Sequence, residues 1–261
     1  MIDIIIPAYN REKMISKTLY SLVAQTDDNF NVIVVDDGST DNTRAVVESF
    51  KDLLNIKYIR NEKNLGPGDS RQVGLDNSTS KFVAFLDSDD MFMPHAVETF
   101  NTAIKANPDI ELLYTDFYEQ LYIDGEMTLV LWKDNFSALH GKLYNMDVIR
   151  KYDIRFVPGM IWSEDAYFNS ICVELMQLTM LKIPTMIWTY NSDSWVRGVN
   201  PERDKVQTMC LIEAMILSAD FVKQYKSHVN HIPHTVNRIM QNKNLKEDEK
   251  IALNKLLERG Q

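Results

Sequence analysis

The 261-residue sequence contains only two cysteines, Cys172 and Cys210, and both lie in apolar stretches. So few thiols argue against a disulfide framework and against a cysteine-rich metal site. We therefore expect two buried free thiols, and a reducing, cytoplasmic location follows from them.

Long hydrophobic runs are also missing. No apolar run reaches the roughly 18–20 residues that a membrane-spanning helix needs. The first residues, MIDIIIPAYNREK, have no basic segment ahead of the apolar ones, and Pro7 interrupts the apolar run. We expect no membrane span and no secretory signal, and interpret this segment as a strand that begins at residue 2.

Basic residues are scarce relative to acids, with 28 Lys and Arg against 37 Asp and Glu and a net charge of −9. This balance argues against broad nucleic-acid binding, which requires a positive face. It would also repel an anionic substrate on average, so a phosphate-binding site would need a local positive source. The hydrophobic fraction of 45% is that of an ordinary soluble globular protein.

Short apolar runs alternate with amphipathic segments in the first half of the chain. Expected strands cover residues 2–6, 31–36, 56–60 and 81–86, and expected helices cover residues 12–25, 41–52, 68–77 and 94–106. Ser39 or Thr40 is the expected cap of the second helix. The alternation predicts an α/β fold with a mostly parallel, Rossmann-like sheet flanked by helices. Ligands of such sheets bind beyond the carboxyl ends of the strands.

The second half is less regular. Expected strands cover residues 110–117, 127–132 and 181–188, and an expected helix covers residues 163–176. We expect a catalytic domain over residues 1–200 and a C-terminal helical extension over 201–261. The apolar positions of this extension at helical spacing are Val206, Met209, Ile212, Met215 and Ile216. Packing against the catalytic domain is the expected role, with a homodimer seam or a dock on a membrane-bound assembly as alternatives.

Four unusual motifs stand near the ends of the expected strands: PAYN (7–10), DDGSTD (36–41), NLGPGDSR (64–71) and DSDD (87–90). Taken alone, DDGSTD fits a turn with a helix cap, and GPGDSR is a weak dinucleotide-binding signal because the third glycine is missing. DSDDMF has Phe92 where a calcium loop requires glycine. What remains is a hard-cation site with few protein ligands, which suits Mg²⁺ or Mn²⁺ shared with substrate phosphates.

In this order and spacing, the four motifs resemble family 2 of the glycosyltransferases, whose members have the GT-A fold. GKLYNMDVI (141–149) is similar to the acceptor-side segment of that family, and SEDAYF (163–168) to the acidic motif that holds its catalytic base. The resemblance is dense over residues 1–100 and ends near residue 200. It implies a nucleotide-sugar-binding half over residues 1–105 and an acceptor-binding half over residues 106–200.

The resemblance implies a donor site formed by Pro7, Ala8, Tyr9, Asn10, Asp36, Asp37, Arg71, Asp87 and Ser88. In it, Tyr9 stacks on the nucleobase, and either Asp36 or Asp37 accepts the imide N–H of uracil, thymine or guanine. Arg71 pairs with the diphosphate, because a planar cation suits that role; a surface salt bridge is the alternative.

The resemblance also implies the metal and catalytic residues. Asp89 binds the metal directly, Asp87 reaches the ribose or the metal's water shell, and Asp90 supports them. Asp165 is the base that deprotonates the acceptor hydroxyl, and Glu164 orients the acceptor. Without the resemblance, two acids in a first helical turn would be interpreted as capping.

Two features of the site stay open. Many members of the family supply a further metal ligand, often histidine, from a loop after the base, but WTYNSDSWVRG (188–198) has none. Asp193 or Ser194 could contribute instead. Trp162, His140 and Lys142 are candidate acceptor contacts, although core packing for Trp162 and a structural role for His140 are the alternatives.

We therefore expect an inverting glycosyltransferase that depends on Mn²⁺ or Mg²⁺ and uses a nucleotide-diphosphate sugar, most simply a UDP-sugar, with a carbohydrate or glycoconjugate acceptor. The alternatives are a sugar-nucleotide-binding subunit without catalysis and a glycosyltransferase that acts on a modified nucleic-acid base. A nucleotidyltransferase is disfavoured, because PAYNREK lacks the glycine-rich loop that this reaction uses.

Overall fold

The structure of the chain is a computed structural model that describes residues 1–123, 126–133, 138–189, 201–225 and 251. Its strands are β1 (Ile2–Ala8), β2 (Phe30–Asp36), β3 (Ile56–Arg60), β4 (Phe82–Phe85), β5 (Met91–Phe92), β6 (Leu112–Ile123), β7 (Glu126–Trp132), β8 (Lys142–Asn145) and β9 (Leu178–Trp188). Its helices are α1 (Ile15–Val23), α2 (Thr43–Glu48), α3 (Pro67–Asp76), α4 (Ala96–Ala106), α5 (Met146–Lys151), α6 (Glu164–Leu175) and α7 (Pro201–Val222).

The described strands form one sheet in the order β3-β2-β1-β4-β8-β6-β9-β5, with β7 paired to β6. Strands β3, β2, β1 and β4 are mutually parallel, as are β6 and β9, while β8 runs antiparallel to both of its neighbours. The predicted α/β fold with a mostly parallel sheet is confirmed. The short strands β5 and β8 were not predicted, because two and four residues give too little alternation to be recognised.

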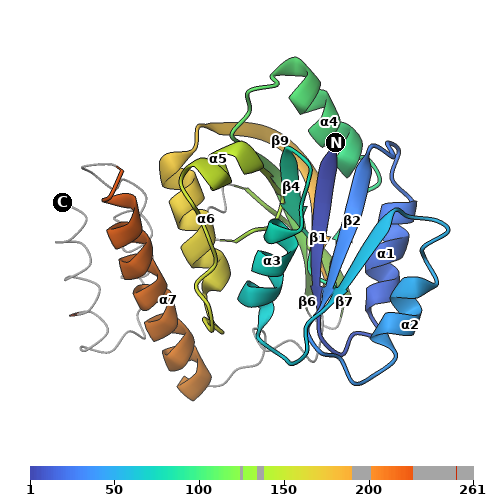
Figure 1. Cartoon of the computed structure of the whole chain (residues 1–261), viewed down its shortest axis with the longest axis horizontal. Coiled ribbons are helices and arrows are strands. Elements are labelled where there is room, and N and C mark those ends of the chain that lie inside the picture. Colours follow the sequence, from blue (N-terminus) through green and yellow to red (C-terminus); the bar gives the residue numbers. More distant parts are fainter. Residues whose placement is uncertain (124–125, 134–137, 190–200, 226–250, 252–261) are drawn as a thin grey trace.

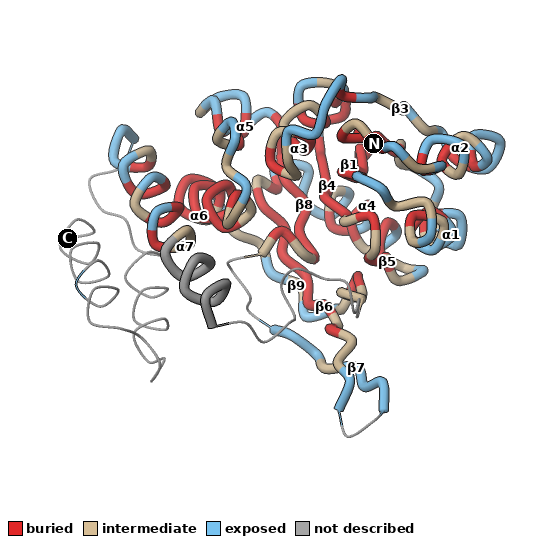
Figure 2. Tube along the Cα trace, turned by 90° about the horizontal axis from the view of Figure 1, so that it is seen from below, coloured by how far each residue is buried: buried red, intermediate tan, exposed pale blue. Residues whose placement is uncertain are grey.

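Two hydrophobic cores lie on the two faces of this sheet. Helices α1, α2 and α4 cover one face, and α3, α5, α6 and α7 cover the other (Figure 1). The sheet residues are apolar on both faces, as strands buried between helix layers require. By contrast, β7 extends beyond the body, and its residues are almost all exposed (Figure 2).

Helix α7 packs against α6, and Ile212 and Met215 are buried in the same core as the sheet residues. The expectation that this helix covers the catalytic domain is confirmed for these two residues. The side chains of Val206 and Met209, and the segments beyond residue 225 apart from residue 251, lie outside the described residues. Cys172 and Cys210 are free thiols. None of the described helices combines the length and the hydropathy that crossing a membrane requires.

The chain order of the parallel strands reverses between β1 and β4, and in parallel sheets such a reversal leaves a crevice at the carboxyl edge. From β1 the chain moves to β2 on one side, whereas β4 lies on the other side, and ligands of such sheets bind at this reversal. The last β1–β4 pair is Ile5 with Phe85, and Ile5 still accepts a hydrogen bond from the N–H of Leu86. Pro7 follows two residues later on the same side of the strand, where its missing N–H leaves no donor unpaired. The strand can therefore separate from β4 at this point, which opens the carboxyl edge.

Helix α2 begins at Thr43 and not at residue 41. The expected cap by Ser39 or Thr40 is wrong: Asn42 is the N-cap residue, and the carboxylate of Asp41 accepts the backbone N–H of Thr43 at 3.0 Å. The reason is that Ser39 Oγ is already used by a backbone N–H of the preceding loop.

Candidate active site

The loops after β1 and β2 are joined to each other. Asn10 has a left-handed backbone (φ 52°), and its N–H donates to Ser39 Oγ at 2.9 Å. Its side-chain oxygen accepts the N–H of Thr40 at 2.8 Å. Asn10 therefore fixes the position of the DDGSTD loop, while the neighbouring Tyr9 is 40% exposed at the crevice. An exposed aromatic ring on a fixed loop is a suitable surface for a nucleobase.

Asp36 is fully buried at the end of β2. Its carboxylate accepts the N–H of Ser39 at 2.7 Å, the hydroxyl of Tyr58, and a guanidinium N–H of Arg60 at 3.3 Å. Burial together with the neighbouring Asp36 carboxylate raises the pKa of Tyr58 to about 12. Tyr58 and Arg60 therefore fix the orientation of the Asp36 carboxylate.

Asp37 connects two loops. Its carboxylate accepts the side-chain N–H of Asn61 at 2.8 Å and the backbone N–H groups of Leu65 and Gly66 at 3.0 and 2.8 Å. These bonds fix the turn that leads into α3, where Gly66 takes φ 98°, a conformation that favours glycine. Both Asp36 and Asp37 thus have internal partners, and which of them contacts a base stays a prediction.

Arg71 joins the loop after β4 to helix α6. One guanidinium nitrogen lies 2.7 Å from Asp87 Oδ1, and the other terminal nitrogen lies 2.7 Å from Glu164 Oε1. Burial opposes its charge, but the carboxylates of Asp87 and Glu164 raise the pKa of Arg71 above its usual value. Within the described residues, the buried Nε has no hydrogen-bond partner and remains available as a donor.

Two glycines allow Arg71 to reach this position. A Cβ on Gly74 would lie 2.3 Å from Ile5 Cγ2, so only glycine lets α3 pack this closely on β1. A Cβ on Gly68 would lie 3.0 Å from Glu164 Cγ, so the start of α3 also touches the start of α6. The GPGDSR motif is therefore a packing element that places its arginine between two acids.

A small cavity of about 20 Å³ lies at the centre of the site, large enough for about one water molecule. It is lined by Arg71, Phe85, Asp87, Leu139, His140 and Asp165. These residues come from α3, β4 and its following loop, the loop before β8, and α6. The predicted donor-side residues Arg71 and Asp87 and the predicted base Asp165 are therefore brought together.

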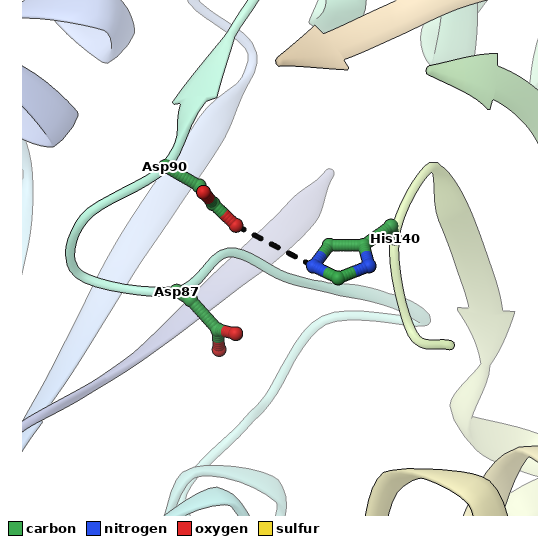
Figure 3. Close-up of side chains that lie close together, drawn as sticks. All are labelled: Asp87, Asp90 and His140. Atoms are coloured by element: carbon green, nitrogen blue, oxygen red, sulfur yellow. Dashed lines mark ion pairs between the residues drawn. The ribbon is translucent and has the colours of Figure 1, made fainter. Parts of the chain in front are cut away.

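Asp87, Asp90 and His140 place their ligand atoms within 4.8 Å of one another. The two aspartates come from one loop and the histidine from another, and the Asp90 carboxylate points at the imidazole ring (Figure 3). Nε2 of His140 lies 3.4 Å from Asp90 Oδ2. Asp89 is half-buried and does not belong to this group, so its role as the direct metal ligand stays a prediction, while Ser88 is buried in the same turn.

The electrostatics of this loop are unusual. Burial, with Asp87 and Asp89 nearby, raises the pKa of Asp90 to about 6, although His140 opposes the shift. Burial also favours the neutral form of His140, but the Asp90 carboxylate outweighs it and raises the pKa of the imidazole. Burial by itself would raise the pKa of Asp87, but the neighbouring Arg71 and His140 outweigh burial and lower the pKa of this carboxyl. Acids therefore dominate this corner, and a bound cation would relieve their repulsion.

The acid pair stands at the start of α6. Ser163 precedes it in a left-handed conformation (φ 58°), which is uncommon for a residue other than glycine. Glu164 is buried, and burial together with Asp165 raises its pKa to about 7 despite the ion pair with Arg71. Asp165 is less buried and lines the cavity. Glu164 is thus held by Arg71, whereas Asp165 is partly exposed and lines the small cavity.

The three candidate acceptor contacts lie in different settings. Trp162 is half-buried on the loop before α6. His140 faces the acidic loop and stacks on Trp188 with a centroid distance of 5.1 Å. Lys142 is buried on β8, donates to the carbonyl of Ala138, and lies 4.6 Å from the centre of the Tyr114 ring. Burial lowers the pKa of Lys142 to about 7, and its role as an acceptor contact stays a prediction.

Sequence reasoning missed the Arg71–Glu164 ion pair, the Asp90–His140 contact and the support of Asp36 by Tyr58 and Arg60. No local signal identifies the first two, because their partners come from separate elements. Tyr58 and Arg60 alternate on β3, the strand beside β2, and this alternation could have placed both near Asp36. Asp193 and Ser194 lie outside the described residues.

The sheet order and the acidic loop after β4 are those of the GT-A fold of nucleotide-sugar transferases. The sequence model of glycosyl transferase family 2 matches residues 3–149, more than half of the chain. The chain therefore belongs to glycosyl transferase family 2.

Two curated relatives are informative. Poly(ribitol-phosphate) beta-N-acetylglucosaminyltransferase TarS of Staphylococcus aureus is 29% identical over 245 residues, which cover 87% of this chain and 42% of TarS. Glycosyltransferase GlyA of Streptococcus pneumoniae is 30% identical over 193 residues, which cover 64% of this chain and 27% of GlyA. The chain thus spans less than half the length of either relative.

Solved structures share the fold. TarS residues 1–349 in complex with UDP-GlcNAc superpose with a TM-score of 0.71 and 24% identity, covering 99% of this chain and 72% of that one. The mannosyltransferase PcManGT from Pyrobaculum calidifontis, in complex with GDP-Man and Mn²⁺, gives a TM-score of 0.58 at 12% identity. It covers 99% of this chain and 85% of that one.

Proposed function

We propose that this chain transfers a sugar from a nucleotide-diphosphate donor, most simply a UDP-sugar, to an acceptor hydroxyl with inversion at the anomeric carbon. The observation that carries the proposal is the shared cavity, where the donor-side residues Arg71 and Asp87 meet Asp165 of α6. In this arrangement Arg71 and Asp87 hold the donor, and Asp165 lies close enough to deprotonate a hydroxyl that attacks it. A displacement reaction requires both groups in one place.

On the donor side, the crevice between β1 and β4 receives the nucleotide. Tyr9 supplies an exposed ring for the base, and a carboxylate oxygen of Asp36 or Asp37 accepts an imide N–H, which favours uracil over cytosine. Arg71 offers the diphosphate its Nε, which has no hydrogen-bond partner among the described residues. TarS, a relative with the same fold, was crystallised with UDP-GlcNAc, and this supports a uridine donor.

The acidic corner fits a divalent cation. Carboxylates with one imidazole suit Mn²⁺ or Mg²⁺, and Asp90 Oδ2 is buried without a hydrogen-bond partner among the described residues. Asp87 would hold the ion together with Asp90, and Asp89 remains a proposed ligand from the same loop. When bound, the ion would neutralise charge on the leaving diphosphate. The complex of PcManGT with GDP-Man and Mn²⁺, a protein of the same fold, supports this proposal.

On the acceptor side, Asp165 removes the proton of the attacking hydroxyl. General-base assistance of this kind contributes roughly 10²–10⁴ to the rate. Glu164 is held by Arg71 and orients the acceptor next to the base. Attack from the face opposite the diphosphate inverts the anomeric centre.

The acceptor is proposed to be a carbohydrate or another polyol of a cell-surface polymer or glycoconjugate. The relative TarS is a poly(ribitol-phosphate) beta-N-acetylglucosaminyltransferase, and this supports a polyol acceptor. A net charge of −9 speaks against the alternative of a modified nucleic-acid base.

A donor panel tests the proposal. The full chain is incubated with UDP-, GDP- and dTDP-sugars, with Mn²⁺ or with chelator, and released nucleoside diphosphate is measured with and without polyol acceptors. We expect Mn²⁺-dependent release of UDP that an acceptor accelerates. Binding of UDP without release from any donor would instead support the sugar-nucleotide-binding subunit without catalysis.

A further inference from the structure

His140 lies beside the acidic loop after β4. The sequence has five histidines, and none of them falls in residues 188–198. His140 stands on the short loop that enters β8, and its imidazole lies next to Asp87 and Asp90. The imidazole therefore comes from a part of the chain that the motif pattern does not assign to metal binding.

The loop that carries His140 is fixed in place. Gly141 has φ 64°, and a Cβ there would lie 2.6 Å from the carbonyl oxygen of Thr115. The N–H and the hydroxyl of Thr115 both donate to the Gly141 carbonyl, at 2.7 and 2.8 Å. Lys142 donates to the carbonyl of Ala138 and closes the loop on its other side. A loop held on both sides presents its side chain with little loss of conformational entropy, as a preorganised ligand should.

Each side chain of the pair has one buried polar atom without a hydrogen-bond partner among the described residues, while Asp90 Oδ1 accepts the N–H of Thr189 at 2.8 Å. Asp90 is 1% exposed, and its Oδ2 has no hydrogen-bond partner among the described residues. The same is true of Nδ1 of His140, and Nε2 approaches Oδ2 no closer than 3.4 Å. Leaving buried polar atoms unpaired costs about 1–3 kcal/mol each, so this arrangement calls for a further partner.

The spacing suits a shared ion. Two atoms bound to the same ion at about 2.1 Å lie at most roughly 4.2 Å apart. The ligand atoms of Asp87, Asp90 and His140 lie within 4.8 Å of one another, so shifts of a few tenths of an ångström would bring them to bonding distance. The Asp90 carboxylate already points toward the ring in this arrangement (Figure 3).

We propose that His140 is a direct ligand of the divalent cation, together with Asp87 and Asp90. This inference rests on the proposed function, because it assigns a ligand of the same donor site. An imidazole nitrogen is a softer ligand than a carboxylate, so the set prefers Mn²⁺ to Mg²⁺. In this proposal the imidazole of His140 completes a ligand set with the two aspartates of the loop after β4.

The experiment measures metal binding and not turnover. The full chain is titrated with Mn²⁺ in the presence of UDP, and bound Mn²⁺ is examined by electron spin echo envelope modulation for coupling to ¹⁴N. The variants are His140→Ala, His140→Gln, which keeps a hydrogen-bonding group near Asp90, and the control His95→Ala. His95 lies before α4, and its Nε2 contacts the carbonyl of Pro184 at 2.9 Å, away from the acidic loop.

We expect nitrogen modulation in the wild type and in His95→Ala, and none in either His140 variant. Both His140 variants should bind Mn²⁺ at least about tenfold more weakly, with a smaller loss for Mg²⁺. Wild-type protein that binds Mn²⁺ without nitrogen modulation overturns the inference and leaves the proposed function standing, even if the variants do not fold. Wild-type affinity in His140→Gln would also overturn it, because His140 would then only position Asp90. The proposed function is tested separately: it fails if the donor panel shows no release of nucleoside diphosphate from any donor.

Discussion

The two halves of the site are built differently. On the donor side, the loops after β1 and β2 and before α3 are tied by internal hydrogen bonds through Asn10, Asp36 and Asp37. On the proposed acceptor side, strands run in mixed directions and Ser163 has a left-handed backbone. The loops after β1 and β2 are therefore held by internal hydrogen bonds before any ligand binds. By contrast, Arg71 Nε, Asp90 Oδ2 and His140 Nδ1, where the two sides meet, have no hydrogen-bond partner among the described residues.

The outer surfaces differ in the same way. The β6–β7 hairpin belongs to the proposed acceptor half and extends from the body (Figure 2). Several of its large apolar residues are exposed. These are Tyr122, Ile123, Met127, Leu129, Leu131 and Trp132. Strands β1, β2 and β4 of the proposed donor half are instead buried between the helix layers, and only the edge strand β3 is partly exposed. The proposed acceptor half is therefore the one that presents apolar side chains to the solvent.

The largest effect is expected at the boundary of the two halves. Asp165→Asn should lower turnover by about 10²–10⁴, because the amide cannot take the acceptor proton. UDP binding should be unchanged, since the donor loops do not depend on this side chain. Steady-state kinetics and calorimetry with UDP measure the two quantities. Near wild-type turnover in a correctly folded Asp165→Asn protein would remove this residue from its proposed role.

Arg71 should contribute most to the cohesion of the two halves. Arg71→Met leaves Glu164 buried without its cation, and we expect a loss of about 3 kcal/mol in the free energy of unfolding. We choose the lower end of the usual range because the Asp87 side chain is 37% exposed and can be solvated. Urea denaturation measures the loss.

Arg155→Met is the matched control for Arg71→Met. Arg155 pairs with Asp76 at 3.0 Å, but both side chains are 49% exposed, so the loss should stay below about 1 kcal/mol. Equal losses in the two variants would show that Arg71 does not link the halves energetically.

A loss of stability similar to that of Arg71→Met is expected within the proposed acceptor half. Gly141→Ala combines a left-handed backbone with a contact 2.6 Å from a backbone oxygen, and should cost about 3 kcal/mol. Gly159→Ala has φ 72° but no atom within 4 Å of the added Cβ, and should cost only about 1 kcal/mol. Thermal denaturation compares them. A similar cost at both positions would mean that the His140 loop is not tightly packed.

The same contrast explains how much the sequence could predict. Strands β1 to β4 and their motifs were found because the apolar run and the polar residues after it are neighbours in sequence. The Arg71–Glu164 pair, 93 residues apart, was out of reach, since periodicity carries no information about partners in other elements. His140 was noted only as a possible acceptor contact, because no pattern placed β8 beside β4. The sequence therefore predicts the motifs that follow each strand, but it does not predict the contacts between elements that are far apart in the chain.

The smallest effect is expected far from the chemistry, at the amino end of β1. The carboxylate of Asp3 accepts hydrogen bonds from the side chain of Asn31, the hydroxyl and N–H of Ser80, the hydroxyl of Ser78 and the N–H of Thr79. Burial by itself would raise the pKa of Asp3, but these bonds, those of Ser80 first, outweigh it and lower the pKa. Asp3→Asn turns an N–H group toward these donors and should cost about 1–3 kcal/mol at pH 7.

The pH dependence tests the origin of that loss. Because the pKa of Asp3 is lower in the folded state than in the unfolded chain, its stabilisation is fully present above about pH 4 and disappears as the pH falls through the folded-state value. The difference between the wild type and Asp3→Asn, measured by urea denaturation, should therefore narrow from pH 6 toward pH 3. Asp52→Asn, at an exposed position, should follow the wild type at every pH. A difference that stays constant down to pH 3 would show that packing, and not the ionised carboxylate, ties this end of the donor half together.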